Sequence, residues 1–151
     1  LARVAESEQR KSNEMIGAEL GYRYAGSPLV CDEPGAPGDD FRSYRPGSWP
    51  GMRLPHVWLQ GHVAIQDRIG SGYTLLRFSD ADPSAFTKAF NGLGAPLAVL
   101  DLKDARARDV YGVDLILLRP DLHVAWRGNR MPGNEVNIAR AVTGHSAAPK
   151  A

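Results

Sequence analysis

The sequence DLILLRPDLHVAWRG, residues 114–128, constrains the fold of this chain more than any other stretch. Residues 115–118 form an unbroken apolar run, which is typical of a strand covered on both faces. Arg119, Pro120 and Asp121 then have turn chemistry, because proline fixes φ and aspartate can accept a hydrogen bond from the nearby backbone.

Beyond this turn, large apolar side chains recur at every second position. Leu122, Val124 and Trp126 are expected on a buried face, and His123, Ala125 and Arg127 lie between them on the other face. The two runs and their turn therefore predict an antiparallel hairpin at the centre of a sheet.

The composition is that of an ordinary globular domain. The chain has 151 residues, about one domain's length, and 43% of them are hydrophobic. Its 18 Lys and Arg against 17 Asp and Glu give a net charge of +1, so neither nucleic acid nor a membrane surface is indicated as a partner. No apolar run approaches the roughly 20 residues of a membrane span, and the polar first residues are not a signal peptide. We therefore expect a cytoplasmic location, and a start at Leu1 rather than Met hints at a longer parent.

The N-terminal segment, residues 1–24, predicts a helix over residues 5–24. Ile16, Leu20 and Tyr24 fall at i, i+4 and i+8, which places one apolar stripe on one face. The residues before Met15 are nearly all polar, so this helix would be only half covered by its own domain. Two explanations stay open: an N-terminal arm that packs on a neighbour, or the last helix of a preceding domain.

Residues 25–55 are dense in proline and glycine, which interrupt both helices and sheet ladders. So long a segment without regular structure is uncommon in a compact domain unless it is a linker or lies across another surface. Its large apolar residues, Tyr44, Trp49 and Met52, are expected to pin it down at intervals. We interpret it as an ordered connector.

Residues 56–145 carry a regular succession of strand and helix signals, before a tail at 146–151. The predicted elements are short β runs at 56–60 and 62–66, a strand at 73–78, a helix opened by Asp82 and Pro83 and closed by Gly92, a strand at 96–102, a short helix at 104–111 ended by Gly112, the hairpin, and a helix from Asn134 to Thr143. The apolar faces expected for the two longer helices are Phe86, Ala89, Phe90 and Leu93 in one and Val136, Ala139 and Val142 in the other.

This order, β-α-β followed by β-β-α, predicts a central mixed β-sheet with helices on both faces. A β-α-β unit crosses right-handed and gives two parallel strands, and the closing hairpin adds antiparallel strands to the same sheet. The predicted class is therefore α/β, with the arrangement of the thioredoxin fold.

The chemistry of a redox thioredoxin is missing from this pattern. Such a protein needs two thiols at C-x-x-C spacing where the first helix begins, and here Ser79-Asp80-Ala81-Asp82-Pro83 stands at that junction. Gly112-Val113-Asp114 precedes the hairpin, where a redox thioredoxin carries a cis-proline. Cys31 is the only cysteine, so an internal disulfide and a cysteine-based metal cluster are excluded. Two interpretations of Cys31 stay open: it is the reactive thiol of a single-thiol peroxidase, or it is a small, partly buried apolar residue.

The remaining polar clusters have structural explanations. His56 and His62 flank a tight turn with no carboxylate at metal-ligand spacing, His123 is expected on the outer face of the hairpin, and His145 is in the tail. Asp82 is explained as a helix cap, whereas Asp39, Asp40 and Asp80 are explained as loop carboxylates exposed to solvent. Gly70-Ser71-Gly72 precedes a strand, whereas a phosphate-binding loop follows one. No G-x-G-x-x-G or G-x-S-x-G motif occurs, so we assign no catalytic, cofactor-binding or metal residue in this chain.

Three stretches carry a resemblance to a known module. They are ELGYRYAGSPLV (19–30), PGMRLPHVWLQG (50–61) continued by DRIGSGYTLLR (67–77), and LILLRPDLHVAWRG (115–128). Together they resemble the C-terminal, thioredoxin-like domain of the FAD-dependent aromatic hydroxylases, the group A flavoprotein monooxygenases that include phenol and polyketide hydroxylases.

The resemblance implies hydroxylation of an aromatic ring with NAD(P)H, O2 and FAD in the parent enzyme. The family's flavin motifs do not stand in this sequence, so FAD and NAD(P)H are expected outside it. The chain would then be a structural domain that contacts the N-terminal FAD-binding and substrate domain, with residues 1–24 as the end of that domain. Homodimer contacts are a further implication, and Arg53 and His56 are the polar residues expected at a contact. The alternatives are a free-standing binding or dimerisation module, and a small enzyme that uses Cys31 or the histidines.

Overall fold

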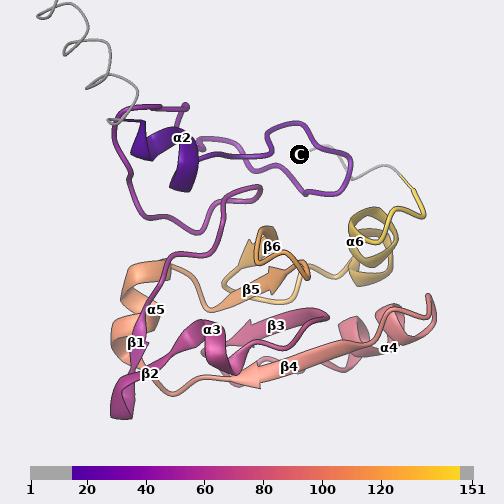
Figure 1. Ribbon diagram of the computed structural model, residues 1–151. Helices are drawn as coiled ribbons and strands as arrows, with labels where there is room; N and C mark the ends of the chain where they lie inside the picture. Colours follow the sequence, from indigo (N-terminus) through magenta and orange to yellow (C-terminus); the bar gives the residue numbers. More distant parts are fainter. Residues whose placement is uncertain (1–14, 147–151) are drawn as a thin grey trace, which may run out of the picture.

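Strand β5 (Leu115–Leu118), the apolar run of the hairpin, lies inside a four-stranded mixed sheet in the computed structural model, which describes residues 15–146 (Figure 1). The strand order is β4-β3-β5-β6. Strand β3 (Tyr73–Arg77) pairs in parallel with β4 (Leu97–Asp101) and antiparallel with β5, which pairs antiparallel with β6 (Val124–Gly128). The predicted hairpin and the predicted mixed sheet are therefore confirmed.

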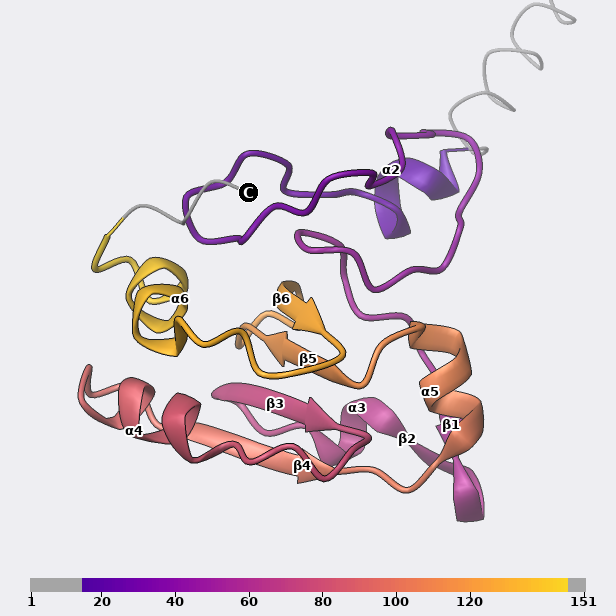
Figure 2. The same ribbon diagram turned by 180° about the vertical axis from the view of Figure 1, so that it is seen from behind.

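Helices cover both faces of this sheet, as Figures 1 and 2 show from opposite sides. Helices α4 (Ser84–Asn91) and α6 (Glu135–Val142) pack on one face, where Leu75 and Leu117 point toward Phe86, Phe90 and Ile138. Helices α3 (Ile65–Arg68) and α5 (Ala105–Tyr111) pack on the other, where Leu76 and Ile116 meet Ile65 and Tyr111. Alternate residues of the buried strands thus supply two apolar cores.

The alternation predicted for residues 122–127 is wrong. Leu122 lies in the turn with φ +65°, and Val124 and Ala125, which are consecutive, are both fully buried. The ladder also shifts register between Leu117 and Leu118. The physical reason is that both faces of β6 are covered, so the polarity of a side chain there does not report which face it occupies.

The helix ends follow from local chemistry. The Asp104 carboxylate accepts a hydrogen bond from the Ala107 amide at the start of α5, and Gly112 ends it with φ +74°, as predicted. Asp82 accepts from the Ser84 amide at the start of α4.

Two details of the helices differ from the prediction. Gly92 follows α4 but keeps a right-handed φ of −63°, and the left-handed glycine is Gly94 at +68°. Val136 of α6 is 60% exposed, because the buried side of this helix is formed by Ile138, Ala139, Ala141 and Val142.

The N-terminal helix is shorter at its end than predicted. Helix α2 (Ile16–Leu20) stops at Gly21, and Arg23 forms an isolated antiparallel bridge with Met52. Residue 23 therefore pairs with a segment about thirty residues later in the chain instead of continuing the helix, because such tertiary contacts can override helix propensity. The start of the predicted helix, residues 5–14, lies outside the described residues, as does the tail from 147.

A small hairpin stands apart from the main sheet. Strands β1 (Trp58–Leu59) and β2 (Val63–Ala64) pair antiparallel across a 3-10 turn, η1 (Gln60–His62), in which Gly61 has φ +75°. The two predicted β runs around Gly61 are thus present, although the second becomes α3 at Ile65. Across residues 15–146 no helix reaches the length and hydropathy that a membrane crossing requires.

Candidate interface groove

The connector runs along the free edge of β6 and is held there by backbone hydrogen bonds. The Gly51 amide donates to the Val124 carbonyl (2.7 Å), and the Val124 amide donates to Met52 (2.9 Å). The Leu54 amide donates to Leu122 at 2.9 Å. Earlier in the connector, the Cys31 amide donates to Ala125 (2.8 Å). The connector is therefore ordered as expected, and it removes the exposed edge that β6 would otherwise present.

This extended path alternates the side chains of the connector. Met52 and Leu54 point into the domain and are 7% and 2% exposed, whereas Arg53 and His56 face outward. Tyr111 fixes the same segment from below, because its buried hydroxyl donates to the Pro55 carbonyl (2.9 Å). The two residues expected at a contact are thus both exposed, on a segment that backbone and side-chain hydrogen bonds attach to the domain.

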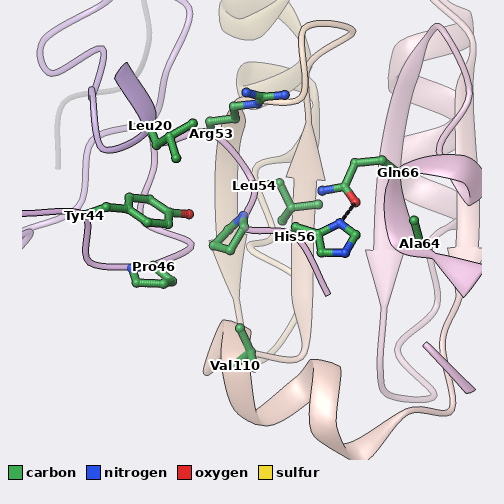
Figure 3. Close-up of a pocket in the computed structure, with 10 residues that line it drawn as sticks. Leu20, Tyr44, Pro46, Arg53, Leu54, His56, Ala64, Gln66 and Val110 are labelled. Carbon is green, nitrogen blue, oxygen red and sulfur yellow. Dashed lines mark hydrogen bonds between the residues drawn. The ribbon is translucent and has the colours of Figure 1, made fainter. Parts of the chain in front are cut away.

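A groove of about 570 Å³ opens beside this segment, and we call it the Tyr44 groove. It is lined by Leu20, Tyr44, Pro46, Arg53, Leu54, Pro55, His56, Ala64, Gln66 and Val110. Figure 3 shows Leu20, Tyr44 and Pro46 on one side, His56, Ala64 and Gln66 on the other, and Val110 of α5 below. Four separate parts of the sequence therefore converge: α2, the connector, residues 56–66 with the β1–β2 hairpin and the start of α3, and α5.

Trp58 lies beside the groove, on the face of the small hairpin that also carries Ala64. It pairs with Ala64 in the β1–β2 ladder, and directly opposed residues of an antiparallel pair share a face. Ala64 lines the groove, so Trp58 stands on the groove side of the hairpin, 52% exposed. The His56 ring meets it edge to face, with ring centroids 4.8 Å apart.

The groove is lined by apolar side chains such as Leu54, Pro55 and Ala64 and by the polar groups of Tyr44, Arg53, His56 and Gln66. His56 Nδ1 lies 2.9 Å from Gln66 Oε1, the hydrogen bond drawn in Figure 3. Burial raises the pKa of Tyr44, although the nearby charge of Arg53 opposes this, so the phenol stays protonated. A surface that mixes apolar and polar side chains in this way is compatible with a protein interface.

A second attachment holds the far end of the connector to the hairpin. Arg127 of β6 donates from Nε and Nη2 to the two carboxylate oxygens of Glu33, at 2.7 and 3.0 Å. Its guanidinium also lies 3.6 Å from the centre of the Trp49 ring. Of the three predicted anchors, Trp49 stacks on Arg127 of β6 and Met52 accepts a hydrogen bond from the Val124 amide of β6, whereas Tyr44 faces the groove.

Cys31 lies near this attachment, and its thiol is poorly reactive at neutral pH. It is 8% exposed, and burial together with the charge of Asp32 raises the pKa of its thiol to about 11. The thiolate is the nucleophilic form, and at neutral pH very little of it is present. Its surroundings fit a small apolar residue better than a peroxidatic thiol.

The other candidate residues do not gather into a site. His62 is exposed at the tip of the small hairpin, His123 packs on the Tyr24 ring (centroids 4.8 Å apart), and His145 contacts Thr143. Asp40 accepts hydrogen bonds from its own loop, at the amides of Arg42 and Ser43. Asp39 and Asp80 are exposed in loops. Within the described residues, no three of the His, Cys, Asp and Glu side chains are grouped to hold a metal ion.

Sequence reasoning missed Val110 in the groove and Trp58 beside it, and the sequence carries no clear signal for either. Trp58 stands in an unbroken apolar run, 57–59, where alternation does not show which side chain faces outward. Val110 follows Ala107 by three residues, so helical spacing places it near the buried side of α5.

Comparisons with known proteins give the family and the fold. A family model described as "Aromatic-ring hydroxylase, C-terminal" matches residues 47–149. The FAD-dependent monooxygenase opdD of Penicillium oxalicum is 36% identical over 124 residues, which cover 78% of this chain and 24% of that protein. The phenol 2-monooxygenase of a Pseudomonas species is 27% identical over 135 residues, covering 76% and 22%.

Solved structures agree with these matches. A structure described as native and K252c-bound RebC-10x superposes with a TM-score of 0.82 and 32% identity, over 96% of this chain and 28% of that one. The chain thus spans about a quarter of the length of the proteins it matches.

Proposed function

Because the chain belongs to the aromatic-ring hydroxylase C-terminal family, we propose that it is the structural and interface domain at the C-terminal end of an FAD-dependent aromatic-ring monooxygenase. The observation that carries the proposal is the Tyr44 groove, an apolar surface built by α2, the connector, the β1–β2 hairpin and α5. The relatives are named as monooxygenases and are about four times as long as this chain. The parent would use FAD and NAD(P)H, and we expect it in the cytoplasm.

The fold supports a thioredoxin-like domain. The order β4-β3-β5-β6, with β3 and β4 parallel and a closing antiparallel hairpin followed by α6, is the arrangement of that fold. We propose residues 56–145 as this domain, 25–55 as its connector, and 1–24 as the end of the preceding flavin domain. Residues 146–151 are its tail.

The described residues do not suit a flavin. A dinucleotide pyrophosphate binds where backbone amides at a helix start follow a strand, and here that place, between β3 and α4, holds Asp80, Asp82 and Pro83. Two carboxylates repel a pyrophosphate, and proline lacks the amide it would need. The flavin of the parent, and the catalytic residues with it, are therefore proposed to lie outside this chain.

The test is to read the frame upstream of Leu1 and to purify both the full-length product and this chain. We expect a dinucleotide-binding fingerprint upstream, a yellow full-length protein that retains FAD, and a colourless chain. A chain that alone binds FAD stoichiometrically would contradict the assignment, and an upstream frame without the fingerprint would favour a free-standing module. Mass photometry of the full-length product measures whether it is also a homodimer.

A further inference from the structure

We propose that the outer edge of β4 pairs with β4 of a second copy of this chain, antiparallel about a two-fold axis at Val99, so that the two sheets join into one. This inference goes beyond the proposed function, because it concerns an edge that does not belong to the Tyr44 groove and does not depend on which domain precedes the chain.

The first argument is that the chain closes one border of its sheet and leaves the other open. The connector donates and accepts backbone hydrogen bonds along β6, whereas among residues 15–146 strand β4 pairs with β3 alone. Figures 1 and 2 agree that β4 lies on the side of the sheet opposite α2. An unpaired edge offers a row of hydrogen-bonding groups to another strand.

The second argument is the direction of the backbone groups of β4. The Leu102 amide donates to the Arg77 carbonyl at 2.9 Å, so the even-numbered residues of this segment turn their backbone groups toward β3. The backbone groups of successive residues in a strand point to opposite sides. The N–H and C=O groups of Leu97, Val99 and Asp101 therefore point away from the sheet.

This edge lacks the features by which sheets usually prevent such pairing. The β3–β4 ladder runs from Leu97 to Asp101 without a register shift, so no bulge turns the edge away. Pro96 precedes the strand, but it is even-numbered, and its missing N–H lies on the side of β3. The one charged residue of the strand, Asp101, is already bound by Nε and Nη2 of Arg77. The edge is therefore regular and locally neutral.

The third argument identifies the partner. When two copies of β4 run antiparallel with Val99 opposite Val99, every residue of each five-residue strand has a partner. Leu97 then faces Asp101, and Ala98 faces Leu100. A register centred on Asp101 would instead place two carboxylates against each other, which is unfavourable. Since the connector closes β6, this two-fold pairing ends at two copies and cannot extend into a fibre.

Apolar contacts would add to the backbone hydrogen bonds of this pairing. Ala98 is exposed, and Val99 and Leu100 are only half-buried in one copy. Side chains directly opposite each other in an antiparallel pair have Cβ atoms about 4.5–5.5 Å apart, so Ala98 of one copy would cover Leu100 of the other. A neutral apolar edge that matches itself in this way favours a second copy over an acidic or a basic partner.

The experiment places one cysteine on the proposed axis of the full-length product. Val99→Cys would bring two thiols onto directly opposite positions, within reach of the short dithiol cross-linker dibromobimane. Val136→Cys is the control, because Val136 is 60% exposed on α6 but lies away from the axis. We expect cross-linked dimer to form at least about tenfold faster with Val99→Cys than with Val136→Cys. Mass spectrometry identifies the linked peptides, so other cysteines do not interfere.

A lysine on the edge tests the pairing itself. Lysine on an edge strand opposes strand addition, so Ala98→Lys should raise the dissociation constant of the dimer, measured by sedimentation, at least about tenfold. Ala85→Lys, the same change at an exposed position of α4, should leave this constant within about twofold. Circular dichroism checks that both variants are folded. Equal dissociation constants for the two folded variants would overturn the pairing.

The remaining outcomes separate this inference from the proposed function. A yellow full-length product that sediments as a monomer overturns the pairing and leaves the proposed function standing. A dimer in which Val99→Cys cross-links no faster than the control uses another surface, and it also overturns the pairing. A product without a flavin domain that cross-links at Val99→Cys overturns the proposed function and supports the pairing.

Discussion

Replacement of Arg127 by lysine should destabilise the domain, because this residue ties both ends of the connector to β6. The guanidinium reaches Glu33 through two nitrogens, at 2.7 and 3.0 Å, and lies 3.6 Å from the centre of the Trp49 ring. Its side chain is 10% exposed. Lysine keeps the positive charge but has neither the planar fork nor the flat face that stacks on an indole.

The magnitude follows from these contacts. Hydrogen bonds to charged groups contribute about 1.5–3 kcal/mol when buried. Glu33 is 39% exposed, so solvent screening lowers the part lost here to about 1 kcal/mol. The stacked contact with Trp49 contributes about 0.5–1 kcal/mol more. We therefore expect Arg127→Lys to lower the free energy of unfolding by about 1.5–2 kcal/mol, a substantial part of the roughly 5–15 kcal/mol of a typical domain.

Urea unfolding of the chain measures this loss. The midpoint should fall while the m-value stays constant, because the surface exposed on unfolding is unchanged. Arg140→Lys is the matched control: Arg140 is exposed on α6, and its guanidinium donates to the His145 carbonyl at 3.4 Å. We expect this control to stay within about 0.5 kcal/mol of the unmodified chain.

A double-mutant cycle separates the contact of Arg127 with Glu33 from its other contacts, the stack on Trp49 and the hydrogen bond from Nη1 to Ser48 Oγ (3.3 Å). Glu33→Gln combined with Arg127→Lys should show a coupling energy of about 1 kcal/mol, as expected for residues joined by direct hydrogen bonds. If Arg127→Lys costs no more than Arg140→Lys, the connector is held by its backbone pairing alone, and the reasoning is refuted.

Two further predictions concern the connector. Gly51 has φ +88°, and an added Cβ would lie 3.0 Å from the Tyr24 amide nitrogen, so Gly51→Ala should destabilise the chain by about 2–3 kcal/mol in urea. Gly26→Ala, at φ +70° in open space, should cost only about 1–2 kcal/mol, and equal losses would show that crowding at Gly51 is absent. Burial raises the pKa of Cys31 from 9.0 to about 11, so alkylation of the folded chain should rise with a midpoint near pH 11. Because the folded state favours the neutral thiol, the contribution of Cys31 to stability is complete below about pH 8.5 and is lost as the pH rises through 11. The variant Cys31→Ala should not show this loss of stability. An alkylation midpoint near pH 9 would contradict the burial of the thiol.

Sequence reasoning succeeded where one local signal determined the structure. The apolar run of β5 and the turn after it gave the hairpin, and Asp104 and Gly112 gave both ends of α5. These features depend on residues close together in the chain. A capping carboxylate or a left-handed glycine needs no distant partner.

The same reasoning failed where a distant segment decided the outcome. The end of α2 depends on Arg23 pairing with Met52, and the burial of Ala125 depends on a second covered face of β6. The Tyr44 groove depends on four segments meeting, and the spacing of apolar residues within one segment carries no information about the others. Membership of the family, by contrast, was recognisable from the sequence, because long stretches resemble it directly.

The density of proline and glycine in residues 25–55 takes on a structural meaning once their contacts are known. A segment that served only as a flexible linker would leave the edge of β6 open and would supply no fixed surface. This connector instead pairs with β6, stacks Trp49 on Arg127 and holds Gly51 in a conformation suited to glycine. The same contacts that close the sheet therefore also hold Tyr44, Arg53 and His56 in place.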